Sequence, residues 1–329
     1  MRRGLWLFWL LFLAACTGTY EPETPVVLVG AAGNELRFFD AGALNHGEAA
    51  APIGSWDLGE AVLDLGYAEG RLFVLTETRL LRFASGGVTL TAMPDVAAAK
   101  TGEWTLSCGG SGYLRLGARE VLAVCGDKAW RLSQVATSGA ALTPVDLGPY
   151  PGWLALALVY DKADASDRLL VLEGAASGAT LRWKDTEVAL SQPGDVAGGW
   201  LFWDPVTGRV AAGLEDGFED HDTLYQWTPG EAAAAVLGQA DLGPKGLFGA
   251  FGDWVFFGDR GALWSAGSPK TTHKLDATGV AAAWLHPDLY LYLAEGSRLS
   301  VFDAAASPPE RLFTRYGLGF RALSGFPLR

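Results

Sequence analysis

A short unit that recurs along the chain limits what this sequence can fold into. The stretch Ala61–Pro94 shows the unit as four apolar runs, separated by tight turns rich in Gly, Glu and Ser. Val62, Leu63 and Leu65, and then Leu72–Val74, are aliphatic, aromatic or β-branched, which suits pleated strands, and no run keeps a helical period. We therefore read the four runs as four strands, the last at Val88–Pro94. One such meander cannot bury both of its faces, whereas stacked copies can.

The third run of the unit ends on a bulky apolar residue, and this position recurs seven times. It is occupied by Phe39, Phe83, Leu132, Trp183, Trp227, Trp264 and Phe302. The six intervals between Phe39 and Phe302 give a period of about 44 residues. A period of about 40–45 residues with four strands per repeat is typical of β-propellers.

The other strands can be placed around this position. Second strands are expected at Val26–Val29, Arg71–Leu75, Val121–Cys125, Leu169–Leu172, Arg209–Ala212, Trp254–Phe257 and Leu289–Leu293, each after an inner strand such as Tyr113–Gly117 or Leu247–Phe251. No inner strand is available before Val26, but Gly319–Ser324 can fill that place. We therefore predict an all-β, seven-bladed β-propeller with four antiparallel strands per blade. The C-terminal strand joins blade 1 and leaves no unpaired edge at the seam.

The repeat resembles seven-bladed propellers in general and matches no specific propeller family. The Trp-Asp pair of WD repeats occurs once, at Trp56-Asp57, and not periodically. Gly-Gly doublets occur at Gly86, Gly109 and Gly198 without the fixed position that kelch repeats give them.

The N-terminus has the features of an export signal. Met1-Arg2-Arg3 is basic, and the apolar run Leu5–Leu13 is too short for a transmembrane helix. Leu13-Ala14-Ala15-Cys16 follows and resembles the bacterial lipobox, which implies cleavage before Cys16 and lipid attachment to it. The alternative is an ordinary signal peptide with an unrelated Cys.

These features divide the chain into a lipoprotein signal peptide (1–15), a lipidated Cys with its tether (16–25) and the propeller domain (26–329). The nine tether residues Thr17–Pro25 span at most about 30 Å, so the domain would lie close to the membrane. A lipid anchor followed by a propeller resembles, in arrangement only, the propeller lipoprotein of the outer-membrane barrel-assembly machinery. We expect an exported protein, lipid-anchored to the bacterial cell envelope on its periplasmic or cell-surface side.

Charge narrows the range of partners. The formal net charge is −12, and it becomes more negative once Arg2 and Arg3 are removed with the signal. A nucleic-acid partner requires a basic surface, so we expect none. Broad electrostatic adsorption to anionic lipid is equally disfavoured, which leaves the lipid as the expected link between the membrane and a monomeric protein.

Cys108 and Cys125 are the two cysteines that remain after Cys16. In an exported protein such a pair usually forms a disulfide, and the predicted strands place both residues at the same rim. The alternative is two free buried thiols. The bridge would fix Val96–Gly110, which we read as a long loop between blades that carries Trp104.

The chain lacks a Gly-x-Ser-x-Gly nucleophile elbow and a Walker loop. Its four His are distributed over different loops and strands, at His46, His221, His273 and His286. We therefore predict no catalytic residues, no metal site and no cofactor.

Two acidic groups leave calcium binding open as an alternative to solvated hairpins. One is Glu215–Asp222, between the second and third strands of blade 5, and the other is Asp161, Asp164 and Asp167 in blade 4. By strand count they lie on opposite faces. The candidate binding residues on the upper face are Trp104, Asp216, Asp220, His221 and Asp222.

Aromatic residues cluster in two stretches, one in blade 5 and one in blade 6. Trp200, Phe202 and Trp203 form one group, and Phe248, Phe251 and Trp254 the other. They could line a sugar- or peptide-binding surface, but seven packed sheets also require many large side chains between blades, which is the reading we favour.

We expect a non-enzymatic binding or scaffold propeller whose upper face takes a protein or glycan partner. The alternative is an enzyme of the lactonase-like or sugar-dehydrogenase-like type, with a site at the channel mouth, and a structural spacer is a third possibility. The inner-strand starts are mainly Gly, Ala, Leu, Val and aromatic, and Asn occurs only at Asn34 and Asn45.

One charged pair is expected inside the channel. Aligning Asp64-Leu65-Gly66 with Arg115-Leu116-Gly117 puts Asp64 and Arg115 at equivalent places on adjacent inner strands. A lone buried charge is costly, so we predict an ion pair between blades 2 and 3. The alternative is that Arg115 is held ready for an anionic ligand.

Overall fold

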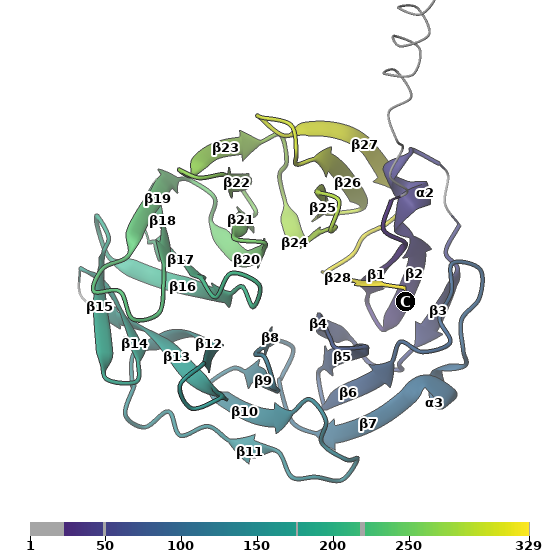
Figure 1. The fold of residues 1–329 in the computed structure, drawn as a ribbon, viewed down its shortest axis with the longest axis horizontal. Coiled ribbons are helices and arrows are strands. Elements are labelled where there is room, and N and C mark those ends of the chain that lie inside the picture. The colour runs from purple at the N-terminus through teal and green to yellow at the C-terminus, as the bar shows by residue number, and fades with distance from the viewer. Residues whose placement is uncertain (1–22, 49–50, 176, 218–220, 329) are drawn as a thin grey trace, which may run out of the picture.

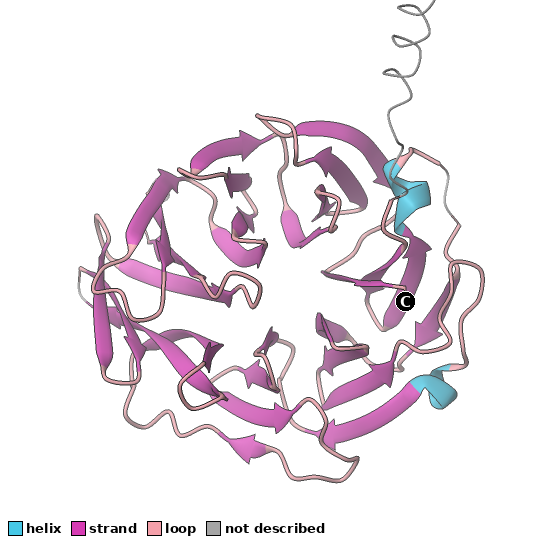
Figure 2. Cartoon of the chain, viewed as in Figure 1, coloured by secondary structure: helices cyan, strands magenta, loops and turns pink. Residues whose placement is uncertain are grey.

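Seven four-stranded antiparallel sheets stand in a ring in the computed structural model, which describes residues 23–48, 51–175, 177–217 and 221–328 (Figure 1, Figure 2). The seven-bladed propeller predicted from the repeat is confirmed. The predicted signal peptide, Cys16 and Asp220 lie outside the described residues. Within the described ranges, no helix has the length and apolar character needed to cross a membrane.

Each sheet runs from an inner strand at the channel to an outer strand at the rim. Blade 1 contains β28 (Ala322–Pro327), β1 (Val26–Ala32), β2 (Glu35–Asp40) and β3 (Gly54–Asp57); blade 2 contains β4 (Val62–Ala68), β5 (Arg71–Thr76), β6 (Arg79–Ala84) and β7 (Lys100–Thr105); blade 3 contains β8 (Tyr113–Leu116), β9 (Glu120–Cys125), β10 (Lys128–Ser133) and β11 (Thr143–Pro144). Two short helices, α2 (Ala41–Asn45) and α3 (Val96–Ala99), interrupt the third connections of blades 1 and 2.

The remaining four blades follow the same order. Blade 4 contains β12 (Trp153–Asp161), β13 (Ser166–Ala175), β14 (Gly178–Trp183) and β15 (Thr186–Ser191); blade 5 contains β16 (Val196–Trp203), β17 (Val210–Asp216), β18 (Asp222–Trp227) and β19 (Ala235–Ala240); blade 6 contains β20 (Pro244–Ala250), β21 (Asp253–Gly258), β22 (Ala262–Ala266) and β23 (Thr271–Leu275); blade 7 contains β24 (Val280–Leu285), β25 (Tyr290–Glu295), β26 (Arg298–Asp303) and β27 (Glu310–Tyr316).

The core lies between neighbouring blades, so strands in the middle of a sheet are buried on both sides. In β1 the run Val26–Ala31 is buried throughout, which explains its unbroken apolar sequence. Phe83 of blade 2, one of the residues that marked the repeat, packs there: its ring lies 4.9 Å from that of Trp56 in blade 1, which in turn lies 4.7 Å from Phe38. The periodic position is therefore a position of contact between blades.

The C-terminal strand closes the ring, as predicted, but it starts later than Gly319. β28 pairs with β1 from Ala322↔Ala31 to Pro327↔Val26. Phe320 precedes the strand and is only 1% exposed, because it fills the space left by Gly30, where an added Cβ would lie 2.6 Å from its ring. Packing of the buried Phe320 ring therefore fixes the segment before β28, and the hydrogen bonding of β28 to β1 begins only after this residue.

The outer strand of blade 2 also differs from the prediction. Val88–Pro94 forms no strand, and β7 pairs with β6 in its place. The segment Val96–Gly110 is therefore not a long loop: it contains α3 and β7. Trp104 lies on β7 and is 5% exposed, so it is a packing residue of blade 2 and not part of an upper-face binding loop.

The meander gives the ring two faces. One face carries the turns between first and second strands and the loops between third and fourth strands, and we call it the lower face. The upper face carries the turns between second and third strands and the connections from blade to blade.

Candidate functional site: the central channel

A cavity of about 730 Å³ lies along the axis of the ring, within the size range of ligand pockets. All seven inner strands contribute to its wall. The aromatic and charged side chains of the wall are Asp64, Tyr67, Glu69, Tyr113, Arg115, Trp200, Phe202, Trp203, Asp204, Lys245, Phe248, Phe257, Trp284 and Arg321. The rest of the wall is mainly Gly, Ala and Leu, so the cavity is largely apolar, with several aromatic rings and a few charged groups.

Asp64 connects the inner strands of blades 2 and 3. Its Oδ1 accepts a hydrogen bond from the backbone N–H of Leu65 at 2.8 Å, and its Oδ2 accepts one from that of Leu114 at 2.7 Å. Burial raises the pKa of this carboxyl, and the positive charge of Arg115 and the two N–H groups offset part of that effect. The carboxylate thus satisfies an N–H on the channel edge of β8, which has no strand beside it.

Arg115 reaches across the channel wall to a blade that is not its neighbour. Its Nε donates to the carbonyl of Leu201 in blade 5 at 2.7 Å, and its Nη1 donates to the carbonyl of Leu114 at 2.8 Å. The guanidinium lies 4.5 Å from the ring centre of Tyr113 and 5.9 Å from that of Phe202. Among the described residues, its Nη2 has no hydrogen-bond partner.

Asp64 and Arg115 line the channel together, as predicted, but the direct ion pair is not formed between these two described residues. The carboxylate accepts from backbone N–H groups and the guanidinium donates to backbone carbonyls, while the two charges act on each other at longer range. The physical reason is that inner strands expose an unpaired backbone edge, which offers both side chains nearer partners. That Arg115 awaits an anionic ligand stays a prediction.

Of the two aromatic groups, two residues lie in the core, three line the channel, and Phe251 is exposed in the turn between β20 and β21. Trp254 and Trp203 are buried, at 0% and 6% exposed. Trp200, Phe202 and Phe248 are half-buried and line the cavity, where the rings of Phe202 and Phe248 lie 5.4 Å apart. The half-buried rings leave apolar surface open to a ligand.

The acidic upper-face residues of blade 5 support a loop. Asp222 is 3% exposed, and its Oδ2 accepts hydrogen bonds from the backbone N–H groups of Leu242 and Gly243 at 2.8 and 2.9 Å. Asp216 is 5% exposed and its carboxylate lies 3.8 Å from Nδ1 of the exposed His221. Burial raises the pKa of Asp222. Both carboxylates therefore face inward and present little surface to a partner.

The second acidic group, in blade 4, is likewise occupied by internal contacts. Asp161 accepts from Nζ of Lys184 at 2.6 Å, and Asp164 pairs with Arg168. Asp167 accepts from three successive backbone N–H groups of blade 3, those of 118–120, at 2.7–2.9 Å. Within the described ranges, no three His, Cys, Asp or Glu side chains are grouped to hold a metal ion.

The predicted disulfide is confirmed. Cys108 and Cys125 are bonded, with their Cα atoms 4.3 Å apart, and both are buried. The bond joins the connection from blade 2 to blade 3 to the end of β9, on the upper face.

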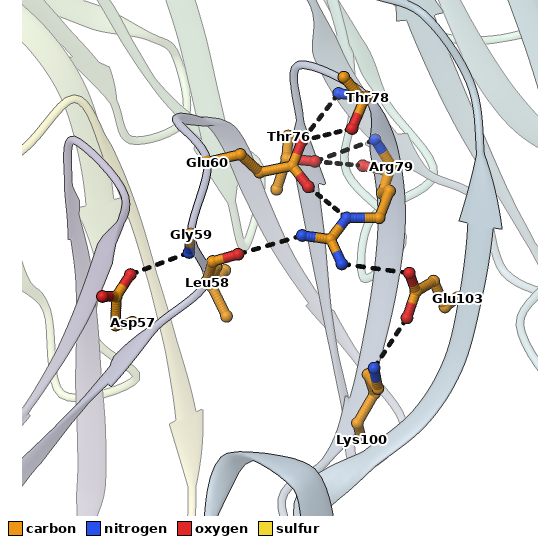
Figure 3. Close-up of polar contacts among 9 residues, drawn as sticks. All are labelled: Asp57, Leu58, Gly59, Glu60, Thr76, Thr78, Arg79, Lys100 and Glu103. Atoms are coloured by element: carbon orange, nitrogen blue, oxygen red, sulfur yellow. Dashed lines mark hydrogen bonds and ion pairs between the residues drawn. The ribbon is translucent and has the colours of Figure 1, made fainter.

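A charged network that the sequence analysis did not find lies on the same face (Figure 3). Glu60 accepts from the backbone N–H of Thr78 at 3.0 Å and pairs with Arg79, whose Nη1 donates to Glu103 at 3.1 Å. Lys100 extends the network to Glu103 at 2.7 Å. It fixes the connection from blade 1 to blade 2, and its members come from three separate segments, so no local sequence pattern marks it.

The described chain begins on the lower face, at the turn of blade 7. The backbone N–H of Thr24 donates to Asp288 Oδ2 at 2.7 Å, and its hydroxyl donates to Oδ1 at 3.1 Å. Glu23 accepts from the Tyr290 hydroxyl at 2.9 Å and from the side chain of Asn45 at 3.2 Å. These contacts determine where the predicted tether leaves the ring.

No protein-family model matches the chain, and no curated protein matches it by sequence. Its fold is similar to that of many solved structures. A protein from Lactobacillus plantarum is 12% identical with a TM-score of 0.60, covering 92% of this chain and 99% of its own. A putative 6-phosphogluconolactonase from Bacteroides uniformis is 12% identical with a TM-score of 0.58, covering 93% and 100%.

A third similar structure is that of apo AztD from Citrobacter koseri. It is 14% identical with a TM-score of 0.52, covering 90% of this chain and 82% of its own. At these identities the likeness extends to the propeller fold alone.

Proposed function

We propose that this protein is an exported, lipid-anchored propeller without enzymatic activity, which presents its upper face and channel to a protein or glycan partner in the cell envelope. The lipobox-like sequence at Cys16 and the Cys108–Cys125 disulfide both support export, since disulfides persist in oxidising compartments.

The observation that carries the proposal is the place where the chain leaves the ring. Thr24 is bound to Asp288 on the lower face, and Glu23 lies seven positions after Cys16 in the chain. That length spans at most about 25 Å. An acylated Cys16 would therefore hold the lower face next to the bilayer and leave the upper mouth of the channel open to a partner.

The channel offers what a binding site requires. Half-buried rings of Trp200, Phe202 and Phe248 supply apolar surface, and the Nη2 of Arg115 is available to an acceptor on a ligand. Ligand sites typically combine such apolar walls with a few placed polar groups.

A crosslinked pull-down of the native lipoprotein from membranes tests the proposal, using one variant that fills the channel and one matched control. Ala281 is exposed and lines the channel, so Ala281→Trp narrows it. Ala235 is exposed on the outer strand β19, so Ala235→Trp adds the same side chain at the rim.

We expect one enriched partner that the Ala281→Trp variant loses and the Ala235→Trp variant keeps. Equal capture by both variants would contradict a role for the channel. Hydrolysis of a sugar lactone by the purified protein would support the enzyme alternative and overturn the non-enzymatic proposal.

A further inference from the structure

Two of the large apolar side chains that the fold leaves exposed lie close together. The exposed set comprises Val135, Val206, Val236, Phe251, Leu312 and Tyr316. Val206, at 67%, lies in the lower-face turn of blade 5, and Phe251, at 46%, in that of blade 6. Pro205, beside Val206, is exposed as well. The tips of two neighbouring inner turns thus form one apolar protrusion beside the lower mouth of the channel.

The two turns are joined by specific contacts. Asp204 Oδ2 accepts from the backbone N–H of Gly252 at 2.5 Å and from the hydroxyl of Thr207 at 2.6 Å. Lys270, whose side chain is 12% exposed, holds the second turn by donating from its Nζ to Asp253 Oδ1 at 2.6 Å. The two turns are therefore held together through the buried Asp204.

The backbone at the tip is one that a bulky residue seldom adopts. Phe251 has a φ of 56°, in the left-handed region that favours glycine. A phenylalanine held there with 46% of its surface exposed is only partly packed against the protein. Such strain is a reason to look for a role outside the fold itself.

The predicted tether leaves from the same face. Thr24 is bound to Asp288, which lies in the corresponding inner turn of blade 7, next to the Phe251 turn of blade 6. With a reach of at most about 25 Å from Glu23 to Cys16, an anchored ring has few orientations available. In each orientation that turns the lower face toward the lipid, the turns that carry Val206 and Phe251 lie close to the bilayer.

We propose that the lower face docks on the membrane surface, with Phe251 and Val206 inserted at the boundary between headgroups and acyl chains. This inference rests on the proposed lipid anchor at Cys16. Aromatic and aliphatic side chains of peripheral proteins are buried about 5–10 Å into this boundary. The net charge of the whole chain is −12, and it is more negative without Arg2 and Arg3, so the attraction to lipid is apolar and raising the salt concentration should not weaken the docking.

The direct test places a spin label on the full-length lipidated protein in vesicles of phosphatidylethanolamine and phosphatidylglycerol. Phe251→Cys carries the label on the lower face, and Ser297→Cys, at an exposed turn between β25 and β26, carries it on the upper face. We expect the label at 251 to collide more often with oxygen, which concentrates in lipid, than with a water-soluble nickel complex. The label at 297 should show the reverse. Labels that behave alike at both sites would overturn the docking.

A second pair of variants separates docking from folding. Phe251→Gly removes the ring and suits the left-handed backbone, so the melting temperature should not fall. Ala165→Gly makes the same backbone change at φ 49° in the exposed lower-face turn of blade 4 without losing a large side chain. With a label at Val206→Cys as reporter, Phe251→Gly should lower the ratio of docked to undocked protein about fivefold and Ala165→Gly should leave it unchanged.

An unchanged ratio in Phe251→Gly would contradict the insertion of that ring. The mass of the N-terminal peptide of the same preparation reports whether Cys16 is acylated. Acylated protein whose turn tips stay in water would refute the docking alone, whereas unmodified Cys16 would refute the anchor and the docking together.

Discussion

Blade 1 and blade 3 occupy the same place in the ring design and are stabilised in different ways. In blade 1, six residue pairs join β28 to β1, and the backbone ladder itself closes the ring. In blade 3 the inner strand has four residues and the outer strand has two, one of them Pro144, which cannot donate to the ladder.

Side chains from neighbouring blades supply in blade 3 what the ladder does not. Asp64 binds the inner edge at Leu114, Asp167 binds the turn at 118–120, and Arg82 donates to the carbonyls of Gln134 and Ala136 at 2.9 and 2.7 Å. The disulfide lies at the upper end of the same blade. A short blade is thus stabilised through its neighbours, and the two blades should respond to different mutations.

Removing Gly319–Arg329 should have the largest effect, because blade 1 loses its whole inner strand. β1 then becomes an exposed edge of buried apolar residues. We expect aggregation or loss of the cooperative unfolding transition. Circular dichroism recorded during heating measures this transition. A truncated protein with the melting temperature of the full chain would show that β28 does not hold the ring closed.

Breaking the disulfide should destabilise the protein, at blade 3, by less than the removal of Gly319–Arg329. For a loop of this length, Cys108→Ser with Cys125→Ser should lower the free energy of unfolding by about 3 kcal/mol. Denaturant titration measures the change. A reducing agent should lower the stability of the wild type by a similar amount and should not affect the double variant; an equal effect on both would argue against the bond as its cause.

Asp167→Asn should weaken the joint between blades 3 and 4. The buried carboxylate accepts three N–H bonds, and the amide would turn a donor toward at least one of them, for a loss on the order of 2 kcal/mol. Asp164→Asn is the control, because its pair with Arg168 is exposed and should change stability by less than about 0.5 kcal/mol. Equal losses in the two variants would contradict the role given to Asp167.

Glu60 should make stability depend on pH at the joint between blades 1 and 2. Burial raises its pKa, but hydrogen bonds from Thr78 and Arg79 outweigh this and hold it below the ordinary value. The stabilisation is therefore present above the ordinary pKa of about 4.3 and is lost as the pH falls through the lowered value.

Glu60→Gln should cost about 1 kcal/mol at neutral pH, and the difference from the wild type should shrink below about pH 4. Denaturant titrations at a series of pH values measure it. A difference that stays constant down to pH 2 would show that the charge of Glu60 is not what stabilises the joint.

The contribution of Asp64 to stability should change with pH in the direction opposite to that of Glu60, and its substitution should have the smallest effect. Its pKa is raised, so the folded state holds the proton more tightly and stability falls as the pH rises through this range. Asp64→Asn should therefore cost about 1 kcal/mol or less at neutral pH, with a larger loss at low pH, because the protonated carboxyl is the better-tolerated form. A loss that grows with rising pH would contradict this account of the channel.

The repeat predicted the ring because packing between blades requires a large apolar residue at the same place in every sheet. It misplaced β7, since Lys100–Thr105 is largely polar and pairs at the rim, whereas the more apolar Val88–Pro94 makes no strand. It also placed the closing strand too early, because nothing local shows that Phe320 fills the gap above Gly30.

The candidate site was less predictable. That Asp64 and Arg115 line the channel followed from their place on inner strands, but their partners are unpaired backbone groups whose positions depend on the closed ring. The protruding turns of blades 5 and 6 and the network around Glu60 were missed for the same reason: each joins segments that meet only after the blades are assembled.

The mass of the N-terminal peptide of the native protein, purified from membranes, tests the central claim most directly. The account predicts that the chain begins at Cys16 and that this residue carries acyl chains. A chain that keeps residues 1–15, or one cut elsewhere with an unmodified Cys16, would contradict it.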